Sequence, residues 1–100
     1  MKVKTINHAA NHHAIFCPAC GYAHGFKTGG GGWSWNGDRD KPTVSPSILT
    51  LGVEPRCHSF VRDGRIQFLG DCTHGMKGQT VELPEFPGTS NTRLNGNGNG

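Results

Sequence analysis

The four cysteines of this chain fall into two pairs whose types and spacing could hold a metal ion. Cys17 and Cys20 form a Cys-x-x-Cys unit followed by Gly21, whereas Cys57 and Cys72 lie much farther along the chain. A Cys-x-x-Cys turn lets two thiolates reach one ion, and glycine adopts the positive φ that such a turn uses. Two well-separated pairs are typical of structural zinc. We therefore predict Zn2+ bound by Cys17, Cys20, Cys57 and Cys72.

The fourth position of this ligand set stays open. Cys72 is favoured by strand geometry, and His74 and His24 are the alternatives because an imidazole nitrogen also binds zinc. His58 is a weaker candidate, since the alternation of side chains along a strand directs it away from Cys57. A redox dithiol is less favoured, because that motif belongs to a βαβ unit and no helical pattern follows the Cys-x-x-Cys unit.

A group of histidines and a carboxylate could support a second kind of chemistry. His58 and Asp71 each adjoin a cysteine, and His74 follows closely. Imidazole beside a carboxylate can perform general acid–base catalysis or hold a second ion. These three residues are therefore the candidate catalytic residues of a small zinc-dependent hydrolase. In the simpler interpretation they have no catalytic role, and Asp71 caps a turn while the histidines support the metal site.

A predicted β-hairpin positions these residues. Residues 57–62 and 65–69 alternate in polarity on either side of Asp63-Gly64, a dipeptide that favours a two-residue type I′ turn. In the resulting register Val61 lies opposite Ile66. The open end of the hairpin then brings together residues that are distant in the sequence.

The alternation of this hairpin separates the candidate residues into two faces. Cys57 and Cys72 share the face that carries the apolar side chains, so both can reach one ion. His58 and Asp71 share the opposite face, where we expect them to lie within about 8 Å of each other. We also expect His74 to lie close to the zinc.

The rest of the chain predicts a small β domain. Sixteen Gly, six Pro and a mean hydropathy of -0.51 disfavour long helices. Short strands are expected at residues 14–16, 33–36, 43–51 and 79–83, the third being an edge or bulged strand because it contains Pro46. Residues 1–12 are expected to form a polar lead-in and residues 25–32 a flexible loop. We predict a mostly antiparallel, zinc-stapled β domain over residues 1–86, with little or no helix, and a disordered tail over residues 87–100.

Charge and hydropathy limit the classes of partner that the protein is expected to bind. The net charge of +3 comes from basic residues scattered along the chain, so the concentrated basic stripe of a nucleic-acid binder is missing. Trp33, Trp35 and Phe26 could stack on bases, although the core of the domain is the better interpretation. No apolar run is long enough to span a membrane, and no signal peptide is visible. We therefore expect no membrane contact and a cytoplasmic location.

Three segments resemble a known family: FCPACGYAH, WSWNGDRDKPTVSPSIL and CHSFVRDGRIQFLGDCTHGMKGQTVELP. The family comprises small, uncharacterised phage and prophage proteins that often carry the label ammonia monooxygenase, and the resemblance spans residues 13–84. It implies a phage-encoded zinc-binding protein that acts in the host cytoplasm or in the virion. In this family the match to Cys72 is sometimes Ser, which leaves His74 or His24 as the fourth ligand. The positions that look constant match Cys17, Cys20, Cys57, His58, Asp71 and His74.

A monooxygenase is not expected, because that chemistry needs a copper or iron site and, for ammonia, membrane helices. Taken together, the sequence and the resemblance predict a small phage-type protein with a structural zinc. It would act as a binding module for a host or phage protein, either as an antagonist or as an assembly component. The alternatives are the zinc-dependent hydrolase that uses His58, Asp71 and His74, and a binder of nucleotides or nucleic acid.

Overall fold

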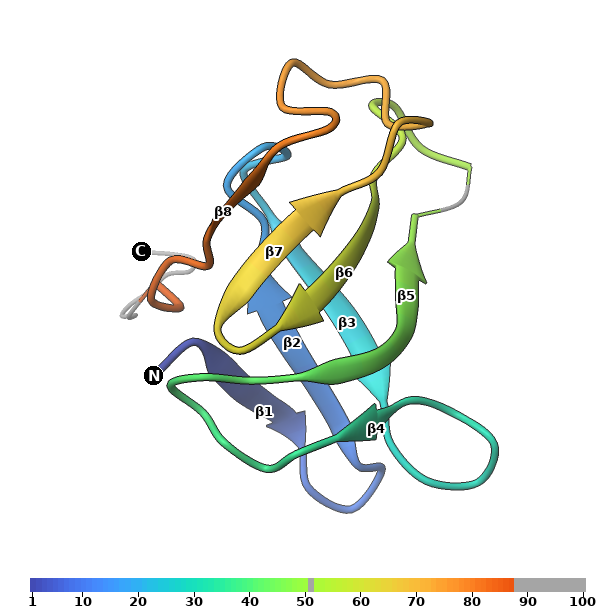
Figure 1. Cartoon of the computed structure of the whole chain (residues 1–100). Coiled ribbons are helices and arrows are strands. Elements are labelled where there is room, and N and C mark those ends of the chain that lie inside the picture. Colours follow the sequence, from blue (N-terminus) through green and yellow to red (C-terminus); the bar gives the residue numbers. More distant parts are fainter. Residues whose placement is uncertain (51, 88–100) are drawn as a thin grey trace.

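The computed structural model describes residues 1–50 and 52–87, and this part of the chain forms two antiparallel sheets (Figure 1). The first sheet has the order β1-β2-β3, and its strands are β1 (Val3–Asn7), β2 (His12–Phe16) and β3 (Ala23–Lys27). The second has the order β4-β5-β6-β7-β8, with β4 (Ser34–Trp35), β5 (Val44–Leu49), β6 (His58–Arg62), β7 (Arg65–Phe68) and β8 (Thr80–Glu82). The predicted antiparallel β class is confirmed. Within these ranges no helix is long and apolar enough to span a bilayer.

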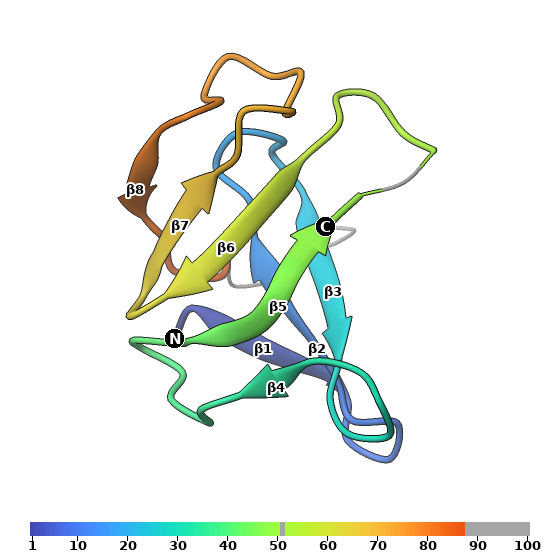
Figure 2. The same cartoon turned by 45° about the vertical axis from the view of Figure 1, so that its right-hand side comes forward.

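The two sheets face each other across one core, as a turned view shows (Figure 2). Alternate residues of each strand point inward, so the first sheet contributes Val3, Ile15 and Phe26 to the core. The second sheet and the residue that follows β8 contribute the other buried apolar side chains: Val44, Ile48, Val61, Ile66, Phe68 and Leu83. A sheet buries one face in this way and leaves the other to solvent. The candidate residues can therefore lie on either side of the same strands.

The β6–β7 hairpin has the predicted register. Val61 pairs with Ile66 and Ser59 with Phe68. Asp63 and Gly64 have φ values of 52° and 78°, as a type I′ turn requires. The irregularity in β5, the strand that contains Pro46, also agrees with the expectation of a bulged strand, because its pairing with β6 shifts between Val44 and Ile48.

The prediction of a polar lead-in over residues 1–12 is wrong. Residues 3–7 form β1, which pairs with β2, and Val3 is fully buried. The period-two signal is weak there because Ile6, the other apolar residue, is 53% exposed on an edge strand. Such a strand forms through pairing with its neighbour and not through its own pattern of burial.

The prediction of a flexible loop over residues 25–32 is wrong for its first part. β3 continues to Lys27, and Gly25 lies opposite Ala14 within the β2–β3 pair. A Cβ atom at Gly25 would come within 2.6 Å of the His12 ring, so glycine makes room for a neighbouring side chain here. The predicted tail lies almost entirely outside the described residues, which end at Pro87.

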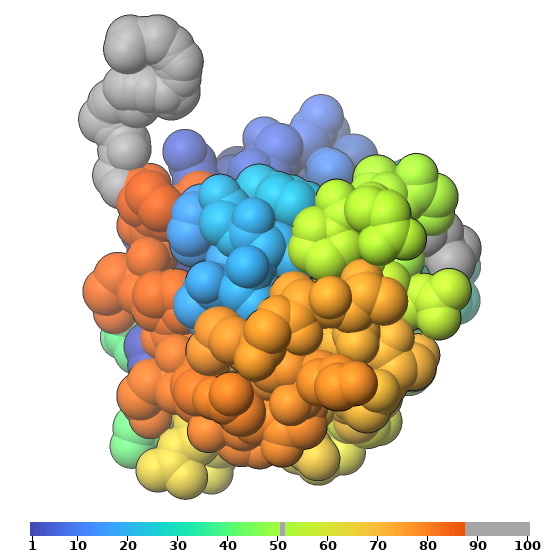
Figure 3. All heavy atoms as spheres, turned by 90° about the horizontal axis from the view of Figure 1, so that it is seen from above, coloured from blue at the N-terminus to red at the C-terminus, as the bar shows by residue number. Residues whose placement is uncertain are grey.

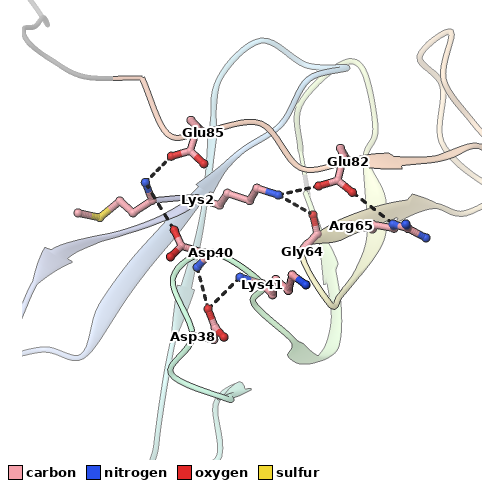
Figure 4. Close-up of polar contacts among 9 residues, drawn as sticks. Lys2, Asp38, Asp40, Lys41, Gly64, Arg65, Glu82 and Glu85 are labelled. Carbon is pink, nitrogen blue, oxygen red and sulfur yellow. Dashed lines mark hydrogen bonds and ion pairs between the residues drawn. The ribbon is translucent and has the colours of Figure 1, made fainter.

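Ion pairs connect the first two residues, which precede β1, to β8 and to the segment that follows it (Figure 4). Lys2 Nζ donates to Glu82 at 2.8 Å and to the Gly64 carbonyl at 3.4 Å, while Arg65 Nε lies 3.3 Å from Glu82. The amino group of Met1 also pairs with Glu85. Exposed ion pairs of this kind contribute little individually. They do connect Lys2, just before β1 of the first sheet, to β8 of the second, where Glu82 also pairs with Arg65 of β7.

Candidate functional site

Three connections that are distant in the sequence meet at one end of the molecule (Figure 3). They are the turn around residues 17–21, the segment 52–57 and the loop 70–78, drawn in blue, lime and orange. All four cysteines lie in or beside these connections. The hairpin therefore does bring Cys57 and Cys72 to the same end, as its register predicts.

A cluster of candidate metal ligands lies beneath this end. The ligand atoms of Cys17, Cys20, His24 and Cys57 all lie within 4.8 Å of one another. Two thiolates bound to one tetrahedral zinc ion at about 2.3 Å would lie about 3.8 Å apart. The Sγ atoms of Cys17 and Cys57 are separated by 3.9 Å. The spacing of this group suits one tetrahedral ion.

Local structure explains how the first three ligands converge. Gly21 has a φ of 78° and donates its N–H to the Cys17 carbonyl, which closes the Cys-x-x-Cys turn. The Cys20 N–H points at Cys17 Sγ at 3.3 Å. His24 follows in β3, where the alternation of buried and exposed residues turns its ring inward.

His24 fits as a nitrogen ligand. Its ring is 4% exposed, and its Nε2 atom is buried without a hydrogen-bond partner among the described residues. A buried polar atom without a partner is costly. A metal ion held by this nitrogen and three sulfurs would satisfy the atom, and a set of three Cys and one His is common at zinc. The chemistry of the donors therefore fits zinc.

The electrostatics of the thiols would also suit a bound cation. The contact with Cys57 lowers the pKa of the Cys17 thiol to about 4. The same contact, together with burial, raises the pKa of Cys57 far above its ordinary value, and burial raises the pKa of Cys20 to about 11. One thiolate thus suppresses the ionisation of its neighbours. A divalent cation would offset this repulsion and allow all three to bind as thiolates.

Cys72 and His74 belong to a second group, which they form with Cys57. His74 Nδ1 accepts the N–H of Met76 at 3.2 Å, so in the neutral ring the proton resides on Nε2. Nε2 is buried and unpaired among the described residues, and one ring nitrogen of His74 lies within 4.8 Å of the Cys57 and Cys72 sulfurs. A protonated nitrogen donates to a thiolate and does not bind a metal ion. His74 is therefore better placed to support the cluster by hydrogen bonding than to bind a metal ion.

On the solvent side of β6, three side chains form a chain of hydrogen bonds. Ser47 Oγ lies 2.8 Å from His58 Nε2, and His58 Nδ1 lies 3.0 Å from Asp71 Oδ2. His58 and Asp71 therefore share a face, as predicted. His74 lies apart from them, because its ring packs edge-on against Phe68.

The ionisation of Asp71 determines where the protons of this hydrogen-bonded group lie. The hydrogen bond with His58 holds the pKa of Asp71 below its ordinary value, so the group is ionised at neutral pH. An ionised carboxylate only accepts, which places the Nδ1 proton between His58 and Asp71. Nε2 of the neutral ring then accepts the Ser47 hydroxyl proton. This is the arrangement of a serine nucleophile, its general base and an orienting acid.

Ser47 is the member of this hydrogen-bonded group that the sequence did not reveal. It lies in β5, and the pairing of Ile48 with Ser59 and Leu49 with His58 carries it to the His58 ring. The serine has no local motif such as G-x-S-x-G, and triads on different folds occur in different chain orders. Geometry alone identifies it.

The two tryptophans are partly buried against the core, in agreement with the preferred interpretation. The Trp33 indole N–H donates to the Ser47 carbonyl at 3.2 Å, and the Trp35 indole N–H donates to the Asp38 carbonyl. Their polar edges are thus used within the protein. Trp33 contributes to holding the strand that carries Ser47.

Comparisons with known proteins gave one match, to a family model. No match was found among curated proteins or among solved structures. One family model matches residues 2–69, a span that includes Ser47 and His58 and ends just before Asp71. The family is described as the bacterial ubiquitination-like system serine protease, BubE, and because its model covers more than half of the sequence, this chain belongs to the BubE family.

Proposed function

We propose that this protein is a serine protease of a bacterial ubiquitination-like system, with Ser47 as nucleophile, His58 as general base and Asp71 as the orienting carboxylate. The observation that carries the proposal is the continuous path of hydrogen bonds from Ser47 Oγ through the imidazole to Asp71. The description of the family supports it. The proposal takes up the hydrolase alternative but assigns the chemistry to serine in place of a metal-bound water.

The arrangement of Ser47, His58 and Asp71 suits acyl transfer from a substrate carbonyl to the serine. Ser47 Oγ attacks the scissile carbonyl carbon while its proton moves to His58 Nε2, and the imidazolium is stabilised by Asp71. When the C–N bond breaks, that proton passes to the leaving amine and an ester remains on Ser47. Water then attacks the ester and gives a proton to His58 Nε2, and this proton passes to Ser47 Oγ as the carboxylic acid is released.

The accessibility of the site suits a protein substrate. Asp71 is 46% exposed and His58 is 24% exposed, so the triad lies at the surface and not in an enclosed pocket. An extended segment of another protein can approach such a site. We propose that the bond cleaved lies in the protein modifier of that system or in its conjugates.

Labelling with a fluorophosphonate probe tests the proposed nucleophile. The wild-type protein should form a covalent adduct at Ser47, and Ser47→Ala should abolish it and reduce hydrolysis of p-nitrophenyl acetate by roughly 10⁴-fold. Ser45→Ala is the matched control, because Ser45 is exposed on the same strand. Equal labelling of the wild type and the Ser47→Ala variant would refute the assignment.

We propose further that the cysteine cluster binds one structural Zn2+ through Cys17, Cys20, Cys57 and His24. The spacing of the thiols and the unpaired Nε2 of His24 support this set. An ion with four protein ligands contributes folding free energy and leaves no position for a substrate. Elemental analysis of protein purified without added metal should find about one zinc per chain, and a much lower content with free thiols would exclude the site.

A further inference from the structure

The Cys72 thiol lies between the metal cluster and the triad and bonds twice to one residue. The backbone N–H of His58 donates to Cys72 Sγ at 3.2 Å, and Sγ donates to the His58 carbonyl at 3.2 Å. Cys72 is 3% exposed, so water does not compete for these contacts. The residue immediately before it is Asp71.

Cys72 lies outside the group of ligand atoms that surrounds the Cys-x-x-Cys pair. It groups with Cys57 and His74, whereas Cys17, Cys20, His24 and Cys57 form the other group. The hydrogen bonds of its Sγ are instead with the backbone of His58. Cys72 is therefore beside the cysteine cluster and not among its four proposed ligands.

The contacts of Cys72 bear directly on the alignment of the triad. The β6–β7 ladder ends at Ser59 and Phe68, beyond which the Leu69 N–H donates to the His58 carbonyl. Cys72 extends this attachment around the turn and bonds to the backbone of the same histidine. It thereby holds the neighbouring Asp71 opposite the His58 ring.

We infer that Cys72 is a positioning residue of the triad, which aligns Asp71 with His58 through its two hydrogen bonds to the His58 backbone, and that it is not a metal ligand. This inference rests on the proposed serine protease function. The loop has other attachments, since the Thr73 N–H donates to the Arg56 carbonyl at 3.0 Å. Loss of the Cys72 thiol should therefore misplace Asp71 without unfolding the loop.

The variants Cys72→Ala and Cys72→Ser separate the two roles. Both should retain one zinc per chain. Cys72→Ala should lower kcat for p-nitrophenyl acetate by about 10-fold to 100-fold while KM changes little, because a small misplacement of catalytic groups acts on the chemical step. Cys72→Ser should recover most of the rate, since a hydroxyl can accept from the His58 N–H and donate to its carbonyl. If Cys72→Ala does not fold, the zinc content and kcat are measured on Cys72→Ser alone.

A double-mutant cycle tests whether Cys72 acts through Asp71. In an Asp71→Ala background, Cys72→Ala should have no further effect on kcat, because the group that it positions is already absent. Additive effects, full activity of Cys72→Ala, or loss of zinc from either Cys72 variant would overturn the inference while leaving the protease assignment intact. If instead Ser47→Ala is as active as the wild type, the proposed function fails and this inference fails with it.

Discussion

Cys57 and His58 are consecutive residues whose side chains serve different sites on opposite sides of one strand. Cys57 is fully buried in the thiol cluster, while His58 bonds to Ser47 and Asp71 on the solvent side. The alternation of side chains along a strand produces this division. Any change that displaces the backbone at the cysteine cluster should consequently disturb the Ser47–His58–Asp71 group as well.

Removing a metal ligand should be far more harmful to the fold than removing the general base. A structural zinc site contributes on the order of 10 kcal/mol in small peptides, which is comparable with the whole stability of a domain. We expect Cys20→Ser to lose the ion and most of its cooperative thermal unfolding. His58→Ala, the control, should retain both, and equal losses of melting temperature in the two variants would contradict these roles.

The histidines near the cluster should differ in their effect on metal content. His24 offers a buried, unpaired nitrogen to the thiols, whereas His74 Nδ1 is occupied by the Met76 N–H. Elemental analysis should therefore show zinc lost from His24→Ala and retained by His74→Ala. The reverse result would make His74 the fourth ligand.

Asp71→Asn should impair catalysis without unfolding the protein. The amide can donate to His58 Nδ1 and so favour the wrong tautomer for accepting the Ser47 proton. We expect hydrolysis of p-nitrophenyl acetate to fall by roughly 10²-fold to 10⁴-fold. Because Asp71 is 46% exposed, the melting temperature should change little. A fully active variant would show that the carboxylate does not orient the ring.

Stability should depend on pH through His13, which lies between the two sheets. Burial, assisted by Arg39, lowers the pKa of His13 below its usual 6.5. The unfolded chain therefore binds a proton more readily, so the contribution to stability is complete above pH 6.5 and is lost as the pH falls through the folded-state pKa. In urea titrations His13→Gln should flatten the decline in the free energy of unfolding below pH 6.5. His8→Gln should have a smaller effect, because His8 is on an exposed turn and is only a minor contributor to the lowered pKa of His13.

Gly64 should tolerate substitution poorly. Its φ is 78°, and an added Cβ would lie 3.1 Å from the Asp40 carbonyl and the Lys41 Cα atom. Gly64→Ala should lower the free energy of unfolding by about 1 kcal/mol or more, measured by denaturant titration. Gly70→Ala is the matched control, because no atom lies within 4 Å of its added Cβ. Similar losses in both variants would be inconsistent with a requirement for glycine at the turn.

Local rules predicted those parts of the site that depend on neighbouring residues. Asp63 and Gly64 determine the hairpin turn, and the period-two pattern around them determines which side chains share a face. The placement of His58 beside Asp71 follows from these two facts. The convergence of Cys17 and Cys20 likewise depends on a single turn with a glycine after it.

Only the tertiary structure places Ser47 against His58 and His24 among the thiols. Ser47 depends on the pairing of β5 with β6, whose register shifts between Val44 and Ile48, and the approach of His24 to Cys57 depends on the packing of one sheet against the other. Backbone preferences act over a few residues, whereas the partner of a strand is chosen by burial and hydrogen bonding across the whole domain. A serine and a histidine without a local motif acquire their chemistry from those long-range contacts.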